Sequence, residues 1–110
     1  MKIIGGKSRG LKLYGPKNNR TRPMNSKAKE AIFNIIQNSI QDATILDLFA
    51  GTGSLGLEAL SRGAKNCIFV ENSSIAVDIL KKNIEKANYK QCSKVIATND
   101  IKTISVLEDK

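Results

Sequence analysis

The chain has 110 residues, which is enough for one small domain. Hydrophobic residues make up 41% and charged residues 25%, and no apolar run approaches the roughly 18 residues needed to cross a bilayer. We therefore expect a cytoplasmic protein with no membrane segment. The chain has no histidine, and its two cysteines, Cys67 and Cys92, lie far apart. This excludes a zinc site and any nucleophile activated by histidine, so we expect no metal.

The net charge of +8 comes from the N-terminal quarter of the chain. Residues 1–30 hold nine basic side chains against Glu30 alone, whereas residues 31–110 hold nine basic and nine acidic side chains. A basic segment joined to a neutral domain is typical of a contact with a phosphate backbone. The alternative is a solvated tail that only aids solubility.

The first part of the chain predicts a short β-ribbon followed by a loop and a helix. Ile3, Ile4, Leu11 and Leu13 flank glycines over residues 1–14, which indicates a ribbon or hairpin. Turn-forming residues fill positions 15–25. Asn25 or Ser26 then caps a helix that ends near Asn38 and has apolar residues at helical spacing: Ala28, Ala31, Ile32, Ile35 and Ile36. We divide the chain after residue 24. Residues 1–24 form the basic ribbon and loop, and residues 25–110 form the partial cofactor-binding domain.

From residue 44 the pattern alternates between strands and helices. Strands are predicted at Thr44–Phe49, at Cys67–Val70 (closing on Glu71) and at Ser93–Ala97. Helices are predicted at 54–62, ending at Gly63, and from Ser73 or Ser74 to about Ala87, with another beginning over 101–107. The second helix should turn Ile75, Ile79, Leu80 and Ile84 inward. This order predicts a parallel sheet with right-handed crossovers, and hence a Rossmann-like α/β fold.

A glycine-rich loop lies between the first strand and its helix and reads Asp47-Leu-Phe-Ala-Gly-Thr-Gly-Ser-Leu-Gly56. In such a loop Gly51 permits a tight turn, Gly53 lets a ligand approach the backbone, and Gly56 allows close packing of helix on strand. The amides at the start of the helix favour an anionic group. The strand–loop–helix context makes this a nucleotide-type cofactor loop, with Phe49 among its residues.

Two cofactors compete for this loop. A dinucleotide would place its pyrophosphate on the helix terminus, next to Asp47, which would repel it. S-adenosylmethionine instead offers an α-carboxylate to the amides and an α-ammonium to Asp47, so Asp47 favours S-adenosylmethionine. Glu71 ends the second strand, where it can accept ribose hydroxyls of either cofactor. Asp100 can accept from the adenine amino group with Ile101 beside the ring, or can simply cap the next helix.

Three stretches of the chain resemble the start of the bacterial 16S ribosomal RNA guanine-N2 methyltransferase family. They are MKIIGGKSRGLKL (1–13), RTRPMNSKAKEAIFNII (20–36) and ILDLFAGTGSLGLEALSRG (45–63), to which Phe69-Val70-Glu71 can be added. The resemblance implies a class I S-adenosylmethionine-dependent methyltransferase fold. It also implies that the partner is 16S rRNA or the assembling small ribosomal subunit. By motif match, the cofactor residues are Asp47, Gly51, Gly53, Glu71 and Asp100. Phe49 in the loop and Ile101 beside Asp100 complete the predicted cofactor contacts. The implied nucleic-acid contacts are Lys7, Arg9, Lys12, Arg20 and Arg22.

One departure from that family concerns catalysis. The family's catalytic tetrapeptide, Asp/Asn-Pro-Pro-aromatic, follows the fourth strand, but the only prolines here are Pro16 and Pro23. No catalytic residue can be assigned, so the chain is expected to be the N-terminal, cofactor-binding half. Its first strand should then be an exposed edge, open to self-association. Three alternatives stay open: a non-catalytic RNA-binding module, a DNA amino-methyltransferase fragment and an NAD-dependent oxidoreductase fragment.

Overall fold

The computed structural model describes residues 1–16 and 25–98 of the chain. Its strands are β1 (Thr44–Leu48), β2 (Asn66–Glu71) and β3 (Ser93–Ala97). Its helices are α1 (Ser26–Ile40), α2 (Ser54–Ser61), α3 (Ser74–Lys86) and the short 3-10 helix η1 (Lys90–Cys92). The strands pair in parallel in the order β1-β2-β3. The predicted α/β fold with a three-stranded parallel sheet is therefore confirmed.

The element boundaries follow from local capping chemistry. The side chain of Asn25 accepts a hydrogen bond from the Ala28 amide at 2.8 Å, and Ser73 accepts one from the Ala76 amide at 3.3 Å. Both residues satisfy an amide that the first turn of a helix leaves free. Helix α2 ends just before Gly63, whose φ of 114° suits a glycine.

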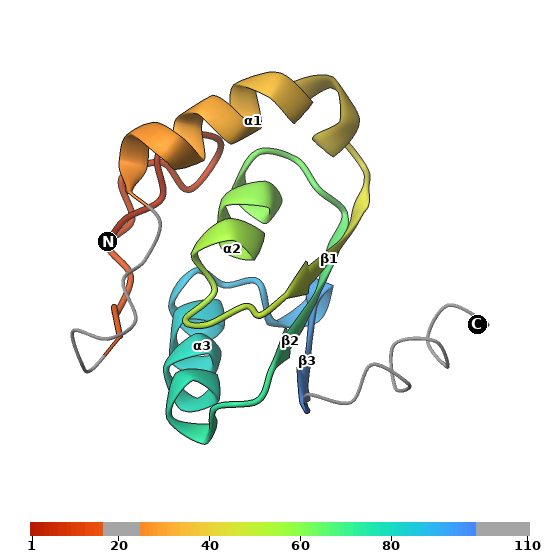
Figure 1. Ribbon diagram of the computed structural model, residues 1–110. Helices are drawn as coiled ribbons and strands as arrows, with labels where there is room; N and C mark the ends of the chain where they lie inside the picture. The colour runs from red at the N-terminus through yellow and green to blue at the C-terminus, as the bar shows by residue number, and fades with distance from the viewer. Residues whose placement is uncertain (17–24, 99–110) are drawn as a thin grey trace.

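Helices α2 and α3 lie on the same side of the sheet, and α1 crosses above α2 (Figure 1). The core lies between these helices and the strands, with Phe69 and Leu57 wholly buried. On α3, the inward positions Ile79, Leu80 and Ile84 are buried as predicted. Ile75 is 56% exposed, so its predicted inward position is wrong. It lies in the first turn of α3.

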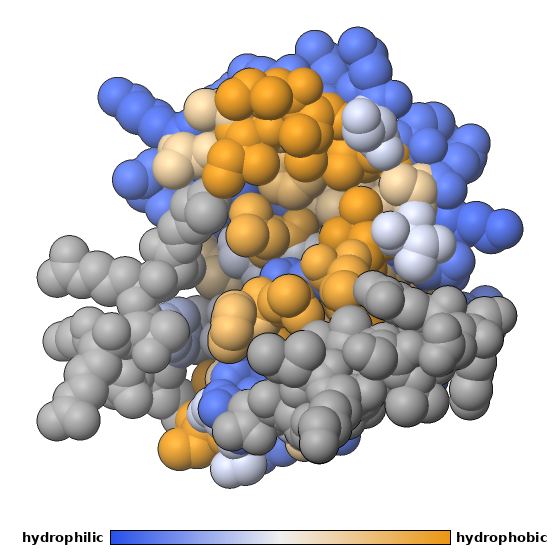
Figure 2. All heavy atoms as spheres, turned by 45° about the vertical axis from the view of Figure 1, so that its right-hand side comes forward, coloured by the Kyte–Doolittle hydropathy of each residue, from blue (hydrophilic) through white to orange (hydrophobic). Residues whose placement is uncertain are grey.

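Apolar side chains form a band over one face of the molecule (Figure 2). The strand β1 pairs only with β2 among the described residues, so its other edge is open, as expected. Helix α1 buries Phe33 and Ile40, whereas all three isoleucines that defined its predicted pattern are exposed. The large apolar residues of α1 and β1 that are more than a third exposed are Ile32, Ile35, Ile36, Leu46 and Leu48.

The N-terminal segment, residues 1–16, contains no strand, although a β-ribbon was predicted. It has one isolated antiparallel bridge, between Lys2 and Lys12, and a few backbone hydrogen bonds such as Ile3 N to Leu11 O at 2.9 Å. The segment folds back on itself only briefly and packs on the domain, with Ile3 buried in the common core. The physical reason is that the Ile4 and Gly5 amides and the Gly5 carbonyl hydrogen-bond to side chains of α2. These backbone groups therefore do not pair with the other arm of the predicted ribbon.

Several predictions fall outside the described residues. They concern Arg20 and Arg22 as nucleic-acid contacts, Asp100 and Ile101 as cofactor contacts, and the helix over 101–107. The domain boundary at residue 24 also lies there. These remain predictions.

Candidate cofactor site

The glycine loop leaves the carboxyl end of β1 and turns back through a run of left-handed residues. Phe49, Gly51 and Gly53 have φ values of 59°, 57° and 95°. The turn is fixed to the sheet by the Ala50 amide, which donates to Val70 O at 2.9 Å, and is closed by the Gly53 amide, which donates to Ala50 O at 2.9 Å. The loop therefore sits over the carboxyl ends of β1 and β2, the position where open α/β sheets bind ligands.

The three glycines serve different purposes. A Cβ on Gly51 would meet no atom within 4 Å, so its left-handed turn explains the glycine there. A Cβ on Gly56 would lie 2.2 Å from Phe69 Cε1, which confirms the predicted close packing of α2 on β2. A Cβ on Gly53 would lie 2.5 Å from Leu80 Cδ1. A side chain at Gly53 would therefore collide with α3, which, together with the left-handed φ, explains the glycine there; the approach of a ligand to its backbone stays a prediction.

Asp47 lies directly beneath the loop and is only 8% exposed. Its Oδ2 accepts a hydrogen bond from the Gly56 amide at 3.1 Å, so the carboxylate faces the start of α2. Burial raises the pKa of Asp47 from 3.8 to about 6, the Gly56 amide opposes this rise, and the charge of Glu71 adds to it. Burial, with Asp47 close by, also raises the pKa of the Cys67 thiol far above its ordinary value.

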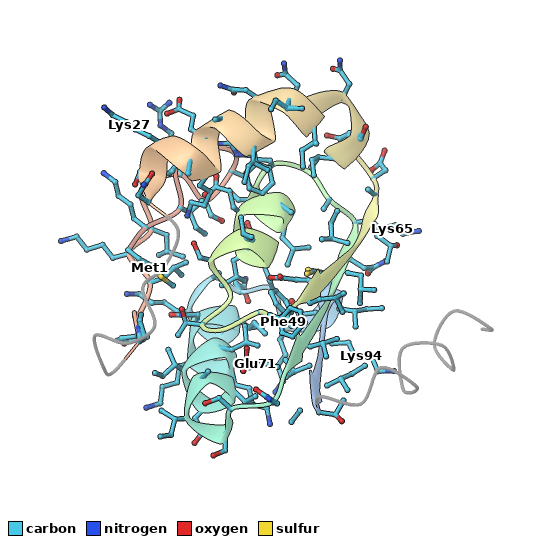
Figure 3. All side chains as sticks on the ribbon, viewed as in Figure 1. Met1, Lys27, Phe49, Lys65, Glu71 and Lys94 are labelled. Carbon is cyan, nitrogen blue, oxygen red and sulfur yellow. The ribbon has the colours of Figure 1, made fainter. Side chains whose placement is uncertain are left out.

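Glu71 flanks the loop from the end of β2 and lies near Phe49 (Figure 3). Its Oε1 accepts from the Gly51 amide at 2.8 Å, and its Oε2 accepts from the Asn72 and Ser73 amides at 3.0 and 2.9 Å. A carboxylate has about four lone-pair positions. Three are in use here, so Glu71 has room for one further donor and would accept a second only by releasing an amide.

Phe49 lies at the mouth of the loop and is 88% exposed. A left-handed φ is rare for a bulky residue and costs of order 1–3 kcal/mol, and such strain clusters at ligand sites. Its ring therefore offers an apolar surface at the same end of the sheet as Asp47 and Glu71. The structure brings Asp47, Phe49, Gly51 and Glu71 together.

The predicted nucleic-acid residues within the described part of the chain are all on the surface. Lys7, Arg9 and Lys12 are exposed. The Lys7 Nζ lies 5.2 Å from the centre of the Tyr89 ring, a cation–π contact that restrains this side chain without neutralising it. All three cations belong to the N-terminal segment, residues 1–16.

Two buried polar clusters were missed by sequence reasoning. Glu58 on α2 is wholly buried, accepts from the Ile4 and Gly5 amides at 2.9 Å each, and pairs with Lys29 at 3.3 Å and Arg62 at 2.8 Å. Burial alone would raise the pKa of Glu58, but these amides and cations hold it below its ordinary value. Lys29, counted among the basic residues above, is therefore internal and not a surface cation.

The second cluster centres on Asn83 of α3, which is 0% exposed. Its side chain hydrogen-bonds to the backbone of Tyr14 and of Thr52. Both clusters had a signal in the sequence: Glu58 stands between Leu57 and Ala59 in an apolar helix, and Asn83 falls at an inward position of α3.

The arrangement of strands and helices is shared with a solved methyltransferase. The solved O-methyltransferase from Bacillus cereus in complex with SAH has a TM-score of 0.68 to this chain, covering 80% of it and 40% of that chain, at 17% identity. At that identity the likeness concerns the fold alone.

The chain belongs to the family described as Conserved hypothetical protein 95, whose match covers residues 1–110. It is similar to Ribosomal RNA small subunit methyltransferase D of Escherichia coli (strain K12), with 43% identity over 84 residues, which cover 76% of this chain and 42% of that protein. The protein of the same name from Haemophilus influenzae is 42% identical over 85 residues, 77% of this chain and 44% of that protein. The family resemblance predicted from the sequence is thus confirmed.

A second solved structure has the same arrangement of elements as this chain. The hypothetical protein TTHA0928 from Thermus thermophilus has a TM-score of 0.81 and 30% identity, and the match covers 99% of this chain and 61% of that one. The chain spans less than half the length of the two curated relatives named above. Among the described residues, no helix is long and apolar enough to span a membrane. The same part of the chain contains no group of three residues suited to hold a metal ion.

Proposed function

We propose that this chain binds S-adenosylmethionine in its glycine loop and supplies the cofactor-binding half of an enzyme that methylates the exocyclic N2 amine of a guanine in 16S rRNA. The observation that carries the proposal is the placing of two carboxylates, Asp47 and Glu71, on either side of a loop that begins a helix. The names of the relatives, which are small-subunit rRNA methyltransferases, support the substrate class.

The residues present fit this cofactor by charge and by hydrogen-bonding capacity. Asp47 accepts from an amide in the first turn of α2 and would face the α-ammonium, while other amides at the start of α2 would face the α-carboxylate. Glu71 has one acceptor position left for a ribose hydroxyl. Phe49 would cover the apolar part of the ligand. When bound, the cofactor would supply the methyl group, and these residues would only hold and orient it.

The basic N-terminal segment fits a contact with RNA. Lys7, Arg9 and Lys12 are exposed, and they would contact the phosphate backbone. We extend the proposal to Arg20, Arg22, Asp100 and Ile101 on the family resemblance alone. The cytoplasmic location and the assembling small subunit as partner belong to the same proposal.

The test is a calorimetric titration of the folded chain with S-adenosylmethionine, with NADH as the competing cofactor. We expect saturable heat with S-adenosylmethionine, which Asp47→Ala abolishes, and no heat with NADH. The Asp78→Ala variant is the matched control, because Asp78 is an exposed acid on α3. No heat from S-adenosylmethionine with the folded protein would refute the proposal.

A second function, a non-catalytic RNA-binding module, is favoured by the exposed cations of the N-terminal segment. It predicts salt-dependent retention of RNA without any binding of cofactor. The two titrations, with cofactor and with RNA, therefore distinguish the two functions.

A further inference from the structure

We infer that Asn83 is a positioning residue that holds the glycine loop and the N-terminal segment in one fixed arrangement. The inference rests on the proposed function, because it concerns how the cofactor loop and the RNA-contacting segment are joined. Asn83 is not itself proposed to contact either ligand. It acts through the backbone of Thr52 and of Tyr14.

The hydrogen bonds of Asn83 are short and nearly complete. Its Oδ1 accepts from the Tyr14 amide at 2.7 Å, and its Nδ2 donates to Tyr14 O at 2.9 Å and to Thr52 O at 2.9 Å. The amide thus uses both donors and one acceptor position while it is 0% exposed. Since its two nitrogen donors go to two different parts of the chain, one side chain fixes both.

An asparagine at this position is not explained by the packing of α3. Its neighbours on the inward face are Leu80, Ile84 and Ala87, all buried in the core. An apolar residue there would favour the helix more than asparagine does and would bury no polar amide. The hydrogen bonds to Tyr14 and Thr52 are therefore what the residue contributes.

The two segments joined by Asn83 are the ones assigned to the two ligands. Thr52 lies between the two left-handed glycines of the loop, and Tyr14 follows the basic residues of the N-terminal segment. A second contact runs in parallel, since Thr52 Oγ1 lies 3.6 Å from Met1 Sδ. Because one side chain is bonded to both segments, a ligand that stabilises one segment in this arrangement also favours this arrangement of the other. By thermodynamic linkage, RNA and cofactor should each tighten the binding of the other by the same factor.

The experiment compares the full chain with Asn83→Ala and with Ile84→Val. Ile84 lies on the same helix and is 4% exposed, so Ile84→Val lowers stability without removing a hydrogen bond to the loop. Binding of S-adenosylmethionine is measured by calorimetry, with and without a short single-stranded RNA oligonucleotide. We expect RNA to tighten cofactor binding about fivefold in the wild type. Asn83→Ala should weaken cofactor binding about tenfold and remove the effect of RNA.

Ile84→Val should keep the wild-type affinity and the effect of RNA, although it melts at a lower temperature. Wild-type behaviour of Asn83→Ala, or equal losses in Ile84→Val, would overturn the inference.

If the wild type binds no cofactor, the proposed function fails, and amide exchange still decides the role of Asn83. Asn83→Ala must then speed exchange of the Gly53 amide about tenfold over Ile84→Val. If Asn83→Ala does not fold, S-adenosylmethionine must slow exchange of the Tyr14 amide in the wild type, and an unchanged rate overturns the inference.

Discussion

Replacing Asp47 by asparagine should make the protein more stable and its cofactor binding weaker. The pKa of Asp47 is raised from 3.8 to about 6, chiefly by burial. That difference corresponds to about 3 kcal/mol by which the folded state disfavours the ionised carboxylate. Asparagine has nearly the same shape and keeps an oxygen for the Gly56 amide. We expect Asp47→Asn to raise the free energy of unfolding by about 1–3 kcal/mol above pH 6.

The raised pKa of Asp47 predicts how the stability gained in Asp47→Asn changes with pH. The folded state holds the Asp47 proton more tightly than the unfolded state, so the destabilisation is full above about pH 6 and disappears as the pH falls towards 3.8. The advantage of Asp47→Asn should therefore shrink over the same interval. The affinity of the wild type for S-adenosylmethionine should fall below about pH 6, because a protonated Asp47 has no charge to offer the α-ammonium.

The assay is urea unfolding of both proteins at several pH values, followed by calorimetric titration with S-adenosylmethionine. The difference between the two unfolding free energies isolates Asp47, because the other titrating groups are common to both proteins. A variant that is less stable than the wild type at about pH 8 would refute the argument from burial. A variant that binds the cofactor as tightly as the wild type would refute the assigned role of the carboxylate.

Three further predictions concern packing and charge. Glu58→Ala should lower the free energy of unfolding by about 3–5 kcal/mol in urea, because it leaves Lys29 buried without its partner; a loss below about 1 kcal/mol would contradict this. Gly56→Ala should lower the free energy of unfolding by about 1–3 kcal/mol, because its Cβ would collide with Phe69. Gly15→Ala should melt like the wild type, because nothing lies within 4 Å of the Cβ position of Gly15. Lys7→Gln should reduce the slope of log affinity for RNA against log salt by about 0.7–1, and an unchanged slope would remove Lys7 from the RNA contacts.

The order and type of the elements could be predicted because they depend on local signals. Alternation of apolar strands with capped helices indicated the parallel sheet, and β3 lies at Ser93–Ala97, where it was expected. The glycine loop was found for the same reason, since the turn, the strand before it and the helix after it are contiguous. The assignment of Asp47 and Glu71 to the cofactor stays a prediction.

The parts that could not be predicted depend on contacts between distant residues. Glu58 bonds to Ile4, 54 residues away, and Asn83 to Tyr14, 69 residues away, and no local pattern shows such pairs. The predicted ribbon is reduced to one bridge because several backbone groups of residues 1–16 hydrogen-bond to α2 and α3 instead. The periodicity of α1 was also misleading, because Lys29 and Phe33 are buried there while Ile35 is 83% exposed.

The position of Met1 has a practical consequence for work with purified protein. Its carbonyl accepts from the Leu13 amide at 2.8 Å, and its sulfur contacts Thr52 in the glycine loop. An affinity tag fused ahead of Met1 would thus begin next to a residue that contacts the proposed cofactor loop. The tag should therefore be cleaved before titration, so that the contact between Met1 and this loop is the native one.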